Sequence, residues 1–546
     1  MSASQQLAAD AARDAHPDAH HPRAFAPATL ILILALSVLG AIIGLQLLVT
    51  LGVTPNTSLV GALVAIALAR LPLGFFRRYR SIHVQNLAQS AISAATFGAA
   101  NSLLLPIGVP FVLGRGDLIL PMFAGVACAM LLDAYLLYRM FGTSVFPAEG
   151  AWPPGIAAGE AIRAGDEGGR KAGVLGIGIG IGVVGGWFGI PMSAFGIAFV
   201  GNVWALAMFG LGLLIRGYSK TLFAGPAFQT LFPGGDVGAA LLPHGFMIGA
   251  GLMALVQVGL AILRRGQGAA SVAEADRRGR RTLGAGFVGY ACIATLIAAL
   301  GGLFADLSAG MLVAFIVYAA FAAFVHELIV GLAAMHSGWF PAFAVALITL
   351  MIGMVIGFPV PALALLVGFS AATGPAFADM GYDLRAGFLL RGNGSAPAFE
   401  AEGRWQQLLA AMTAFVVAIV VVLLSWKGYF AQNLVPPVDR VYVATIKAGM
   451  SGPAAQHLLL WAVPGAALQL LGGQQRQLGI LFATGLLIVF PAAGWAVLAG
   501  IVARLIWSRL GGAPGQTTMQ VFGGGVIAGD ALFAFFSSIG KNLSRV

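Results

Sequence analysis

Long apolar stretches alternate with short polar connections from residue 27 to the end of the chain. Most of them approach the roughly 20 residues that an α-helix needs to cross the hydrocarbon core of a bilayer. They lack the strict alternation of apolar and polar positions that a membrane β-barrel requires. The pattern predicts an all-α, polytopic membrane protein with about 14–16 transmembrane helices. The stretches lie near 27–52, 58–75, 83–112, 118–138, 172–190, 192–215, 237–263, 284–304, 309–333, 341–357, 359–378, 407–426, 455–472, 478–506 and 521–539.

Composition and charge agree with this class. Of the 546 residues, 59% are hydrophobic and 9% are charged, whereas soluble domains have about 25% charged residues. The net charge of +10 comes largely from arginines in two short connections, 77–80 and 264–281. Short basic loops remain in the cytoplasm, so the charge indicates topology and membrane lipid as a partner, not nucleic acid. Arg216 and Lys220 conflict with this topology unless 221–236 re-enters the membrane or one of the basic groups is misleading.

Residues 1–26 are polar and predict a disordered cytoplasmic tail, followed by a transmembrane domain over 27–546. Mixed-charge inserts at 139–171 and 379–406 each follow an apolar stretch. They suggest two related halves, about 27–282 and 283–546, as in transporters built from repeats. Prolines within several stretches further predict broken or re-entrant helices.

A run of polar residues inside one apolar stretch is the first candidate for chemistry. From Gln85 the chain reads QNLAQSAISAATFGAANS. On a helix Gln85, Gln89 and Ser93 share a face, with Asn86 beside it. Amides facing lipid would leave their hydrogen-bonding groups unsatisfied, so this face must meet water, substrate or protein. We expect a substrate-facing surface, with packing between helices as the alternative.

Acidic and histidine residues at membrane depth are the second candidate, because such residues are costly there and often functional. His326 and Glu327 are adjacent and point to different faces. Asp379 and Asp383 are four residues apart on one face, after a break at Gly374-Pro375, although Arg385 could neutralise one of them. Proton coupling is the expected role of these residues. The same role is expected of Asp530, and Asp133 is read as either functional or interfacial.

Other motifs carry no separate function. A GxGxxG at Gly180, Gly182 and Gly185 lies within an apolar stretch and lacks the strand and acidic residue of a dinucleotide site. No lysine follows a glycine-rich loop as in an ATPase, and Cys128 and Cys292 have no metal-ligand spacing around them. The sequence therefore predicts neither a cofactor nor a metal site.

Five segments resemble patterns of a known family. They are Gln89–Ala95 (QSAISAA), Trp152–Glu160 (WPPGIAAGE), Asp379–Arg391 (DMGYDLRAGFLLR), Leu481–Leu486 (LFATGL) and Ala528–Leu532 (AGDAL). In order and spacing they resemble the Q-T-x-A-S-A-G, F-P-E-G-x-A-x-A-E, D-x-x-Q-D-L-K-x-G-Y-L-L-G, F-A-x-G-L and A-G-E-A-L elements of the oligopeptide transporter (OPT) family. Departures fall at Ala95, Pro154, Tyr382, Arg385, Arg391 and Asp530.

The resemblance extends over nearly the whole chain. It implies a 16-helix plasma-membrane fold and proton-driven uptake of peptides or metal–chelate complexes. We therefore interpret the chain as a secondary active transporter, not an enzyme, that imports small oligopeptides across the cytoplasmic membrane by proton symport. The alternatives are uptake of metal–chelate or siderophore complexes and, less favoured, an integral-membrane enzyme. The candidate substrate-binding residues are Gln85, Asn86, Gln89, Ser93 and Glu160, and the candidate proton-coupling residues are His326, Glu327, Asp379, Asp383 and Asp530.

Overall fold

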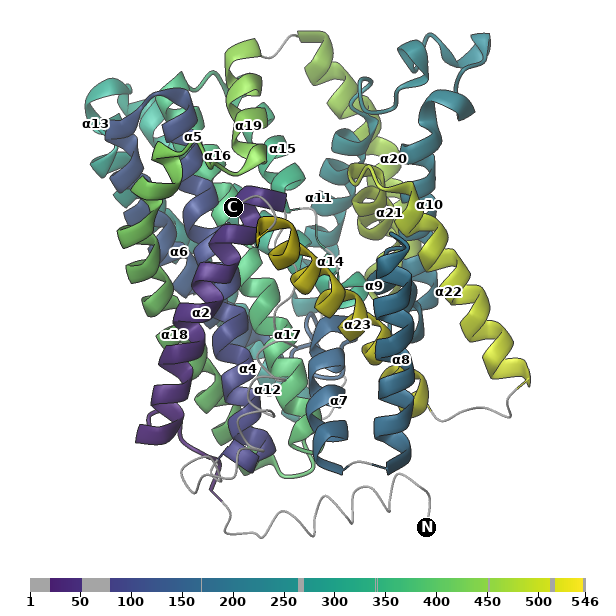
Figure 1. The fold of residues 1–546 in the computed structure, drawn as a ribbon. Coiled ribbons are helices and arrows are strands. Elements are labelled where there is room, and N and C mark those ends of the chain that lie inside the picture. Colours follow the sequence, from purple (N-terminus) through teal and green to yellow (C-terminus); the bar gives the residue numbers. More distant parts are fainter. Residues whose placement is uncertain are drawn as a thin grey trace.

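The computed structural model describes residues 20–51, 79–167, 169–263, 270–338, 340, 342–449, 452–510 and 516–543. These residues form a bundle of helices, many of which run roughly along one common direction (Figure 1). The predicted all-α, polytopic class is therefore confirmed. The predicted apolar stretch at 58–75 and the first 19 residues of the predicted tail lie outside the described residues.

The first half of the chain contributes helices separated by short turns. They are α2 (Pro27–Leu51), α4 (Ile82–Phe97), the π-helical turn η2 (Gly98–Leu104), α5 (Leu105–Leu113), α6 (Ile119–Met140), α7 (Pro153–Glu167), α8 (Gly169–Trp187), α9 (Met192–Gly196), α10 (Val203–Leu222) and α11 (Leu242–Leu263).

The second half begins within the long helix α12. Its helices are α12 (Ala270–Leu300), α13 (Leu303–Asp306), α14 (Ala309–Ser337), α15 (Ala342–Ile356), α16 (Val360–Ala372), α17 (Pro375–Leu390), α18 (Pro397–Ala431), α19 (Pro437–Ala448), α20 (Gly452–Arg476), α21 (Leu478–Leu487), α22 (Pro491–Leu510) and α23 (Gln516–Leu543).

Within the described residues, eight helical segments are long and apolar enough to cross a membrane. They are Pro27–Val49, Ile82–Leu113, Gly116–Met140, Arg277–Leu300, Ala309–Ser337, Val360–Leu390, Pro397–Ala431 and Pro491–Arg509. Five further apolar helical segments are only 10–17 residues long. The chain is thus a multi-pass membrane protein with short as well as full-length spans, while the total of about 14–16 crossings stays a prediction.

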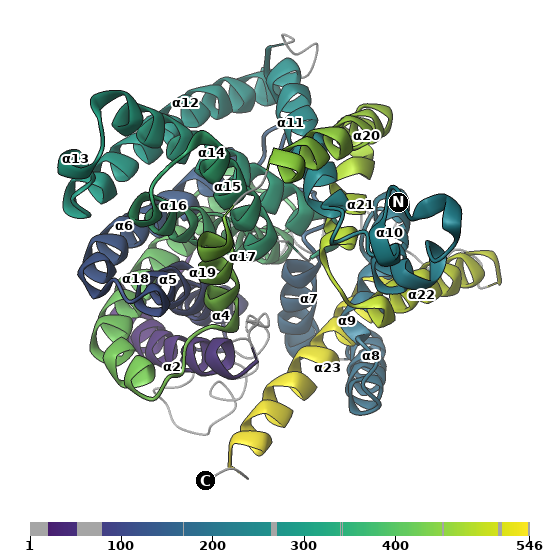
Figure 2. The same cartoon turned by 90° about the horizontal axis from the view of Figure 1, so that it is seen from above.

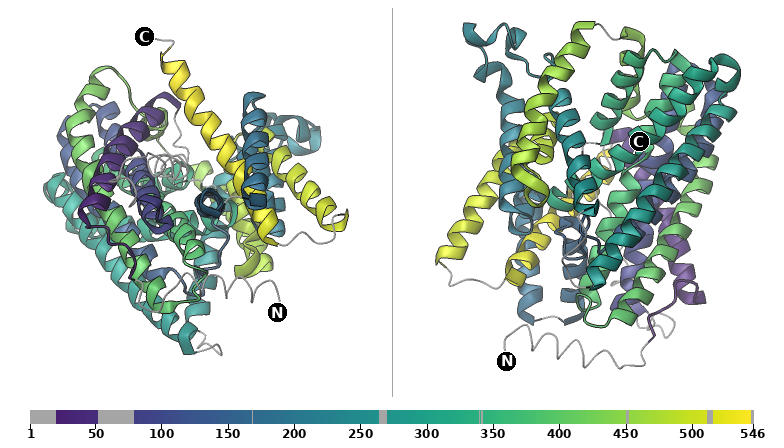
Figure 3. Two further views of the ribbon diagram at one scale, coloured as in Figure 1. Left: turned by 60° about the horizontal axis from the view of Figure 1, so that its bottom comes forward. Right: turned by 180° about the vertical axis from the view of Figure 1, so that it is seen from behind.

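The helices form two groups that interleave the first and second halves of the sequence (Figure 2). One group holds α2, α4–α6, α12, α14 and α16–α19, with α12 and α14 side by side (Figure 3). The other holds α8–α11 and α20–α23, and α7 contacts α17 of the first group and α23 of the second. In the second group α8 packs on α23 and α11 on α20, while α10 packs on α21 and α9 on α22. If α8–α11 correspond in order to α20–α23, each of these contacts has its counterpart with the two sets interchanged. A two-fold relation between two repeats would give this pattern.

Close packing explains part of the glycine content. Gly40 and Gly44 on α2 face the backbone of α4, where a Cβ atom would approach the carbonyl oxygens of Ile92 and Thr96 to 2.6 and 2.4 Å. Small residues at this spacing let two membrane helices approach closely, and the polar helix α4 is held against α2 in this way. The hydroxyl of Thr96 donates to the carbonyl oxygen of Gly40 at 3.0 Å, so part of the polar face meets protein.

The end of α10 and the start of α12 lie at opposite ends of the bundle, with the 22-residue helix α11 between them in the chain (Figure 1). Arg216 in the last part of α10 pairs with Asp236 at 3.0 Å, so part of the basic charge at this end is neutralised. The topology around 216–264 stays a prediction.

The last residues of the predicted tail pack against the start of α18. The backbone N–H of Ala24 donates to Oε1 of Gln406 at 2.8 Å, and the N–H of His21 donates to Glu402 at 3.3 Å. The ring of His21 is buried between those of His83 and Phe399, with centroids 5.1 and 5.3 Å away. The described part of this segment is thus anchored to the helical bundle.

Candidate functional site

Two of the predicted substrate residues and two of the predicted proton-coupling residues contact each other directly. Gln89 donates from Nε2 to Oδ1 of Asp383, and Ser93 donates from Oγ to Oδ1 of Asp379, both at 2.5 Å. All four side chains are fully buried. Gln89 and Ser93 are four residues apart on α4, and Asp379 and Asp383 are four residues apart on α17. Successive turns of the two helices therefore lie opposite each other along this contact. The structure therefore unites residues that are 286–294 positions apart in the sequence.

A break within one long candidate span positions the two aspartates. The span Val360–Leu390 is divided at Thr373 and Gly374 into α16 and α17. Gly374 has φ of +98°, a conformation that favours glycine, and Pro375 follows at the start of α17, where its missing N–H costs nothing. The break predicted at Gly374-Pro375 is confirmed, and it places Asp379 about one turn into a helix that is buried along its whole length.

Neither aspartate has an ion-pair partner among the described residues. The second oxygens of both carboxyl groups, Oδ2 of Asp379 and of Asp383, are buried and have no hydrogen-bond partner there. Arg385, which the sequence offered as a neutralising group, instead donates from Nη1 to the carbonyl oxygen of Ala148 at 3.2 Å. The two carboxyl groups are therefore held by one amide and one hydroxyl, both of them neutral donors.

The other predicted residues of α4 are used in packing. Gln85 donates to the carbonyl oxygen of Tyr79 at 3.0 Å, beside the first turn of the helix. The side-chain oxygen of Asn86 accepts from Nε2 of Gln407 on α18 at 3.3 Å. Gln407 also donates to the backbone oxygen of Asp383 at 2.7 Å. The packing alternative thus describes Gln85 and Asn86, and the sequence analysis missed Gln407, whose position at the start of an apolar stretch was its only signal.

Glu160 lies on α7, which packs along α17. It pairs with Arg163 at 3.4 Å, and Arg163 also donates to the carbonyl oxygen of Leu389 at 2.6 Å. Gly155 on the same helix faces the carbonyl oxygen of Tyr382, where a Cβ atom would come within 2.2 Å. The WPPG segment and the second half of α17 therefore contact each other. Glu160 lies in that contact, not beside Gln89 and Ser93.

His326 and Glu327 on α14 turn to different neighbours, as predicted from their adjacency. Nδ1 of His326 and Oγ of Ser370 on α16 are 3.1 Å apart. Glu327 interacts with Asp133 on α6 and Tyr290 on α12. Both side chains are buried. They lie among α12, α14 and α16, apart from the α4–α17 contact.

Asp530 occupies a third location. Its Oδ2 accepts the backbone N–H of Ser193 at 2.7 Å, at the start of the short helix α9. A carboxylate at this position caps the first turn of a helix. The helix that carries it, α23, packs on α7, α8 and α9. The structure therefore gives Asp530 a capping contact in the second group of helices, separate from the acids of α14 and α17.

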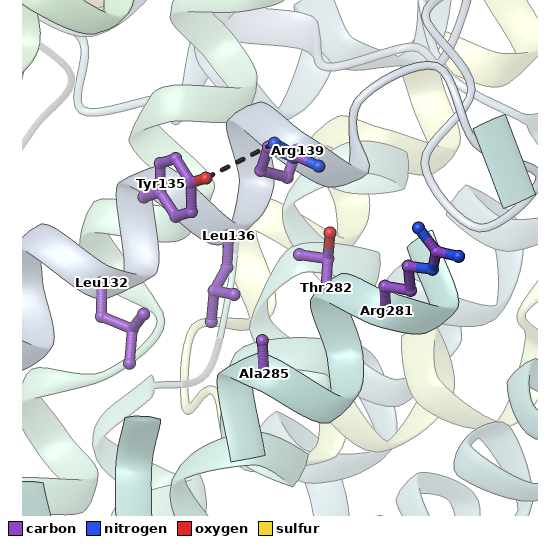
Figure 4. A pocket seen from close by; sticks show the side chains of 7 residues that line it. All are labelled: Leu132, Tyr135, Leu136, Arg139, Arg281, Thr282 and Ala285. Atoms are coloured by element: carbon purple, nitrogen blue, oxygen red, sulfur yellow. Dashed lines mark hydrogen bonds between the residues drawn. The ribbon is translucent and has the colours of Figure 1, made fainter. Parts of the chain in front are cut away.

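Two surface hollows lie away from these residues. One, of about 200 Å³, lies between α6 and α12 and is lined by Leu132, Tyr135, Leu136, Arg139, Arg281, Thr282 and Ala285 (Figure 4). The other lies between α8 and α23 and is lined by Val183, Trp187, Leu532, Phe533 and Ser537. None of the predicted site residues lines either of these two hollows. Gln89, Ser93, Asp379 and Asp383 are fully buried, so the α4–α17 contact is closed in this conformation.

Comparison with known proteins agrees with the sequence patterns. The model of the OPT oligopeptide transporter protein family matches residues 275–541, which include Glu327, Asp379, Asp383 and Asp530. No curated protein matches the chain. The polar helix α4 precedes the matched region, but its side chains bond to the matched helix α17. Residues 275–541, nearly half of the chain, are therefore similar to the OPT oligopeptide transporter family, while the patterns at Gln89–Ala95 and Trp152–Glu160 lie before the matched region.

Proposed function

We propose that this protein imports small oligopeptides across the cytoplasmic membrane by proton symport. The family is one of transporters, and the apolar helices make the chain a multi-pass membrane protein. One observation supports the choice of protons: Asp379 and Asp383 are fully buried, and their hydrogen bonds come from the neutral groups of Ser93 and Gln89. A buried carboxylate without a cation is costly, and a bound proton removes that charge.

The same contact links proton binding to substrate binding. An ionised carboxylate holds an N–H or O–H donor about twice as strongly as a neutral acceptor does. Protonation of Asp379 and Asp383 therefore weakens their hold on Ser93 and Gln89. The released hydroxyl and amide are suited to the carboxylate and carbonyl oxygens of a peptide. In this scheme substrate replaces the two aspartates as the partner of α4 once protons have bound.

Metal–chelate complexes are the alternative cargo, because they also present carboxylates to hydroxyl and amide donors. For the orientation, we propose a cytoplasmic N-terminus. Helix α12, whose first half carries Arg277, Arg278, Arg280 and Arg281, begins at the end of the bundle where α2 begins (Figure 1), and basic segments favour the cytoplasmic side.

Uptake by purified protein in liposomes tests the proposal. The vesicles receive an inward proton gradient and either mixed di- to hexapeptides or ferric and zinc chelates. We expect a current with the peptide pool that a protonophore abolishes, and loss of that current in Asp379→Asn and Asp383→Asn. Asp117→Asn is the matched control, because Asp117 is exposed and pairs with Arg115 at the surface. A current with chelates alone would reverse the choice of cargo, and uptake that ignores the gradient would exclude symport.

A further inference from the structure

A second buried polar cluster, the Asp133–Tyr290–Glu327 chain, lies where α6, α12 and α14 meet. The hydroxyl of Tyr290 donates to Oδ1 of Asp133 at 2.5 Å, and Glu327 interacts with both residues. Oδ2 of Asp133 accepts the backbone N–H of Gly374 at 2.9 Å. All three side chains are at most 1% exposed. This buried cluster therefore extends to Gly374, at the helix break before α17.

The surroundings of these residues favour a bound proton beyond the one on tyrosine. A tyrosine hydroxyl has one hydrogen to donate, and the short bond to Asp133 uses it. Two buried carboxyl groups that interact with each other are costly to ionise together, so a hydrogen on Glu327 suits its contact with the same hydroxyl. Oε1 of Glu327 has no partner among the described residues, which suits the carbonyl oxygen of a protonated carboxyl group better than a carboxylate. The bonds run from Glu327 to Tyr290 to the Asp133 carboxylate.

Among the described residues of the helices around it, no cation contacts the Asp133–Tyr290–Glu327 cluster. Asp133 interacts with Tyr290 on α12 and with the Gly374 N–H at the start of α17. Glu327 interacts with Asp133 and Tyr290. The remaining titratable groups nearby are His326, which is turned to Ser370 on α16, and Asp379 on α17, which is held by Ser93. A proton is therefore what neutralises one of the two carboxyl groups in this part of the described structure.

We propose that Asp133, Tyr290 and Glu327 form a proton-binding site that controls the start of α17, an inference that rests on the proposed proton symport. Tyr290 passes its hydrogen to Asp133 as it takes the hydrogen of Glu327. The step converts a Glu327 acid and an Asp133 carboxylate into a Glu327 carboxylate and an Asp133 acid, with no other reactant.

This transfer reaches the α4–α17 contact through the backbone. Neutral Asp133 holds the N–H of Gly374 more weakly than the carboxylate does. Gly374 is one residue before Pro375, and Asp379 and Asp383 follow on the same buried helix. Loosening the start of α17 therefore shifts both aspartates relative to Ser93 and Gln89. Asp133 and Tyr290 act as positioning residues for these acids.

Infrared spectroscopy of the full-length protein tests the proton site without any substrate. We expect the wild type at neutral pH to show the carbonyl stretch of a buried protonated carboxyl group that Glu327→Gln removes. A glutamine amide can still donate to Tyr290, so this variant keeps the packing. Asp117→Asn, at the exposed ion pair, should leave the band unchanged. A spectrum that is the same in Glu327→Gln and in the wild type would overturn the proposal.

Transport by Tyr290→Phe tests the coupling. We expect exchange of labelled for unlabelled peptide pool to persist, while gradient-driven uptake falls about tenfold, the ratio that one lost hydrogen bond gives. Tyr318→Phe is the control. Tyr318 also lies on α14, but its hydroxyl donates to the carbonyl oxygen of Thr349 on α15. Full gradient-driven uptake in Tyr290→Phe, or loss of exchange as well, would overturn the proposal. Absence of uptake by the wild type would refute only the proposed function, because the infrared test needs no substrate.

Discussion

Replacing Gln89 with leucine separates a transport role of α4 from a packing role. Leucine is similar in size to glutamine but lacks the amide that donates to Asp383 at 2.5 Å. If the amide hydrogen-bonds only to a protonated aspartic acid, its loss removes a neutral hydrogen bond worth about 0.5–1.5 kcal/mol. The buried Oε1 of Gln89 has no partner among the described residues, and removing it offsets part of that loss. We therefore expect the free energy of unfolding to fall by about 1 kcal/mol or less.

The alternative gives a different magnitude. If Asp383 were ionised, Gln89→Leu would leave a buried charge with no partner and cost about 3–5 kcal/mol. Unfolding in mixed detergent micelles measures this difference, and liposome uptake measures transport on the same preparation. We expect folded protein with no uptake, while Gln432→Leu, at the exposed end of α18, keeps both properties. Surviving uptake would mean that the polar face only packs, and a loss above 3 kcal/mol would refute a protonated Asp383.

Three further perturbations test the surroundings of the site. Glu400→Gln breaks a buried two-bond ion pair with Arg391 (2.7 and 3.1 Å) and should cost about 3–5 kcal/mol in detergent unfolding. Burial lowers the pKa of His21 from 6.5 to about 4, so the folded state binds fewer protons than the unfolded state between these values, and up to about 3 kcal/mol should be lost as pH falls from 6.5 to 4. His21→Phe should remove the contribution of His21 to that dependence in a pH series of thermal midpoints. Gly381→Ala places a Cβ atom 2.3 Å from the ring of Trp152 and should cost about 1–3 kcal/mol, which the double variant with Trp152→Leu should recover.

The sequence predicted which faces carry polar groups but not which faces meet. The spacing of four between Gln89 and Ser93, and between Asp379 and Asp383, follows from helix periodicity alone. Their pairing across 286–294 residues depends on tertiary packing, which one sequence does not encode locally. The glycine of the break is a local signal, because only glycine readily adopts φ of +98° there, and so the break was predictable.

Asp133 shows where reading by position fails. Its place late in an apolar stretch, close to Arg139, suggested an interfacial residue, but the structure buries it completely. Its partner Tyr290 is a single tyrosine in the apolar stretch 284–304, and that isolated hydroxyl was the available signal. Asp530, whose small neighbours and lack of a nearby cation predicted a proton or substrate site, accepts the N–H of Ser193, and its part in coupling stays a prediction. A buried acid can be recognised from sequence, but its partner decides its role.

The contacts at the two ends of α17 differ in whether protonation of a carboxyl group would weaken them. At its start and middle the helix is held through carboxyl groups without cations: Asp133 on Gly374, and Asp379 and Asp383 on α4. At its end the contacts are ionic, because Arg391 pairs with Glu400 and Arg163 donates to the last turn. Protonation therefore weakens one end of the helix and leaves the other fixed. We expect α17 to tilt about its C-terminal end, which would open the α4–α17 contact from the side of the helix break.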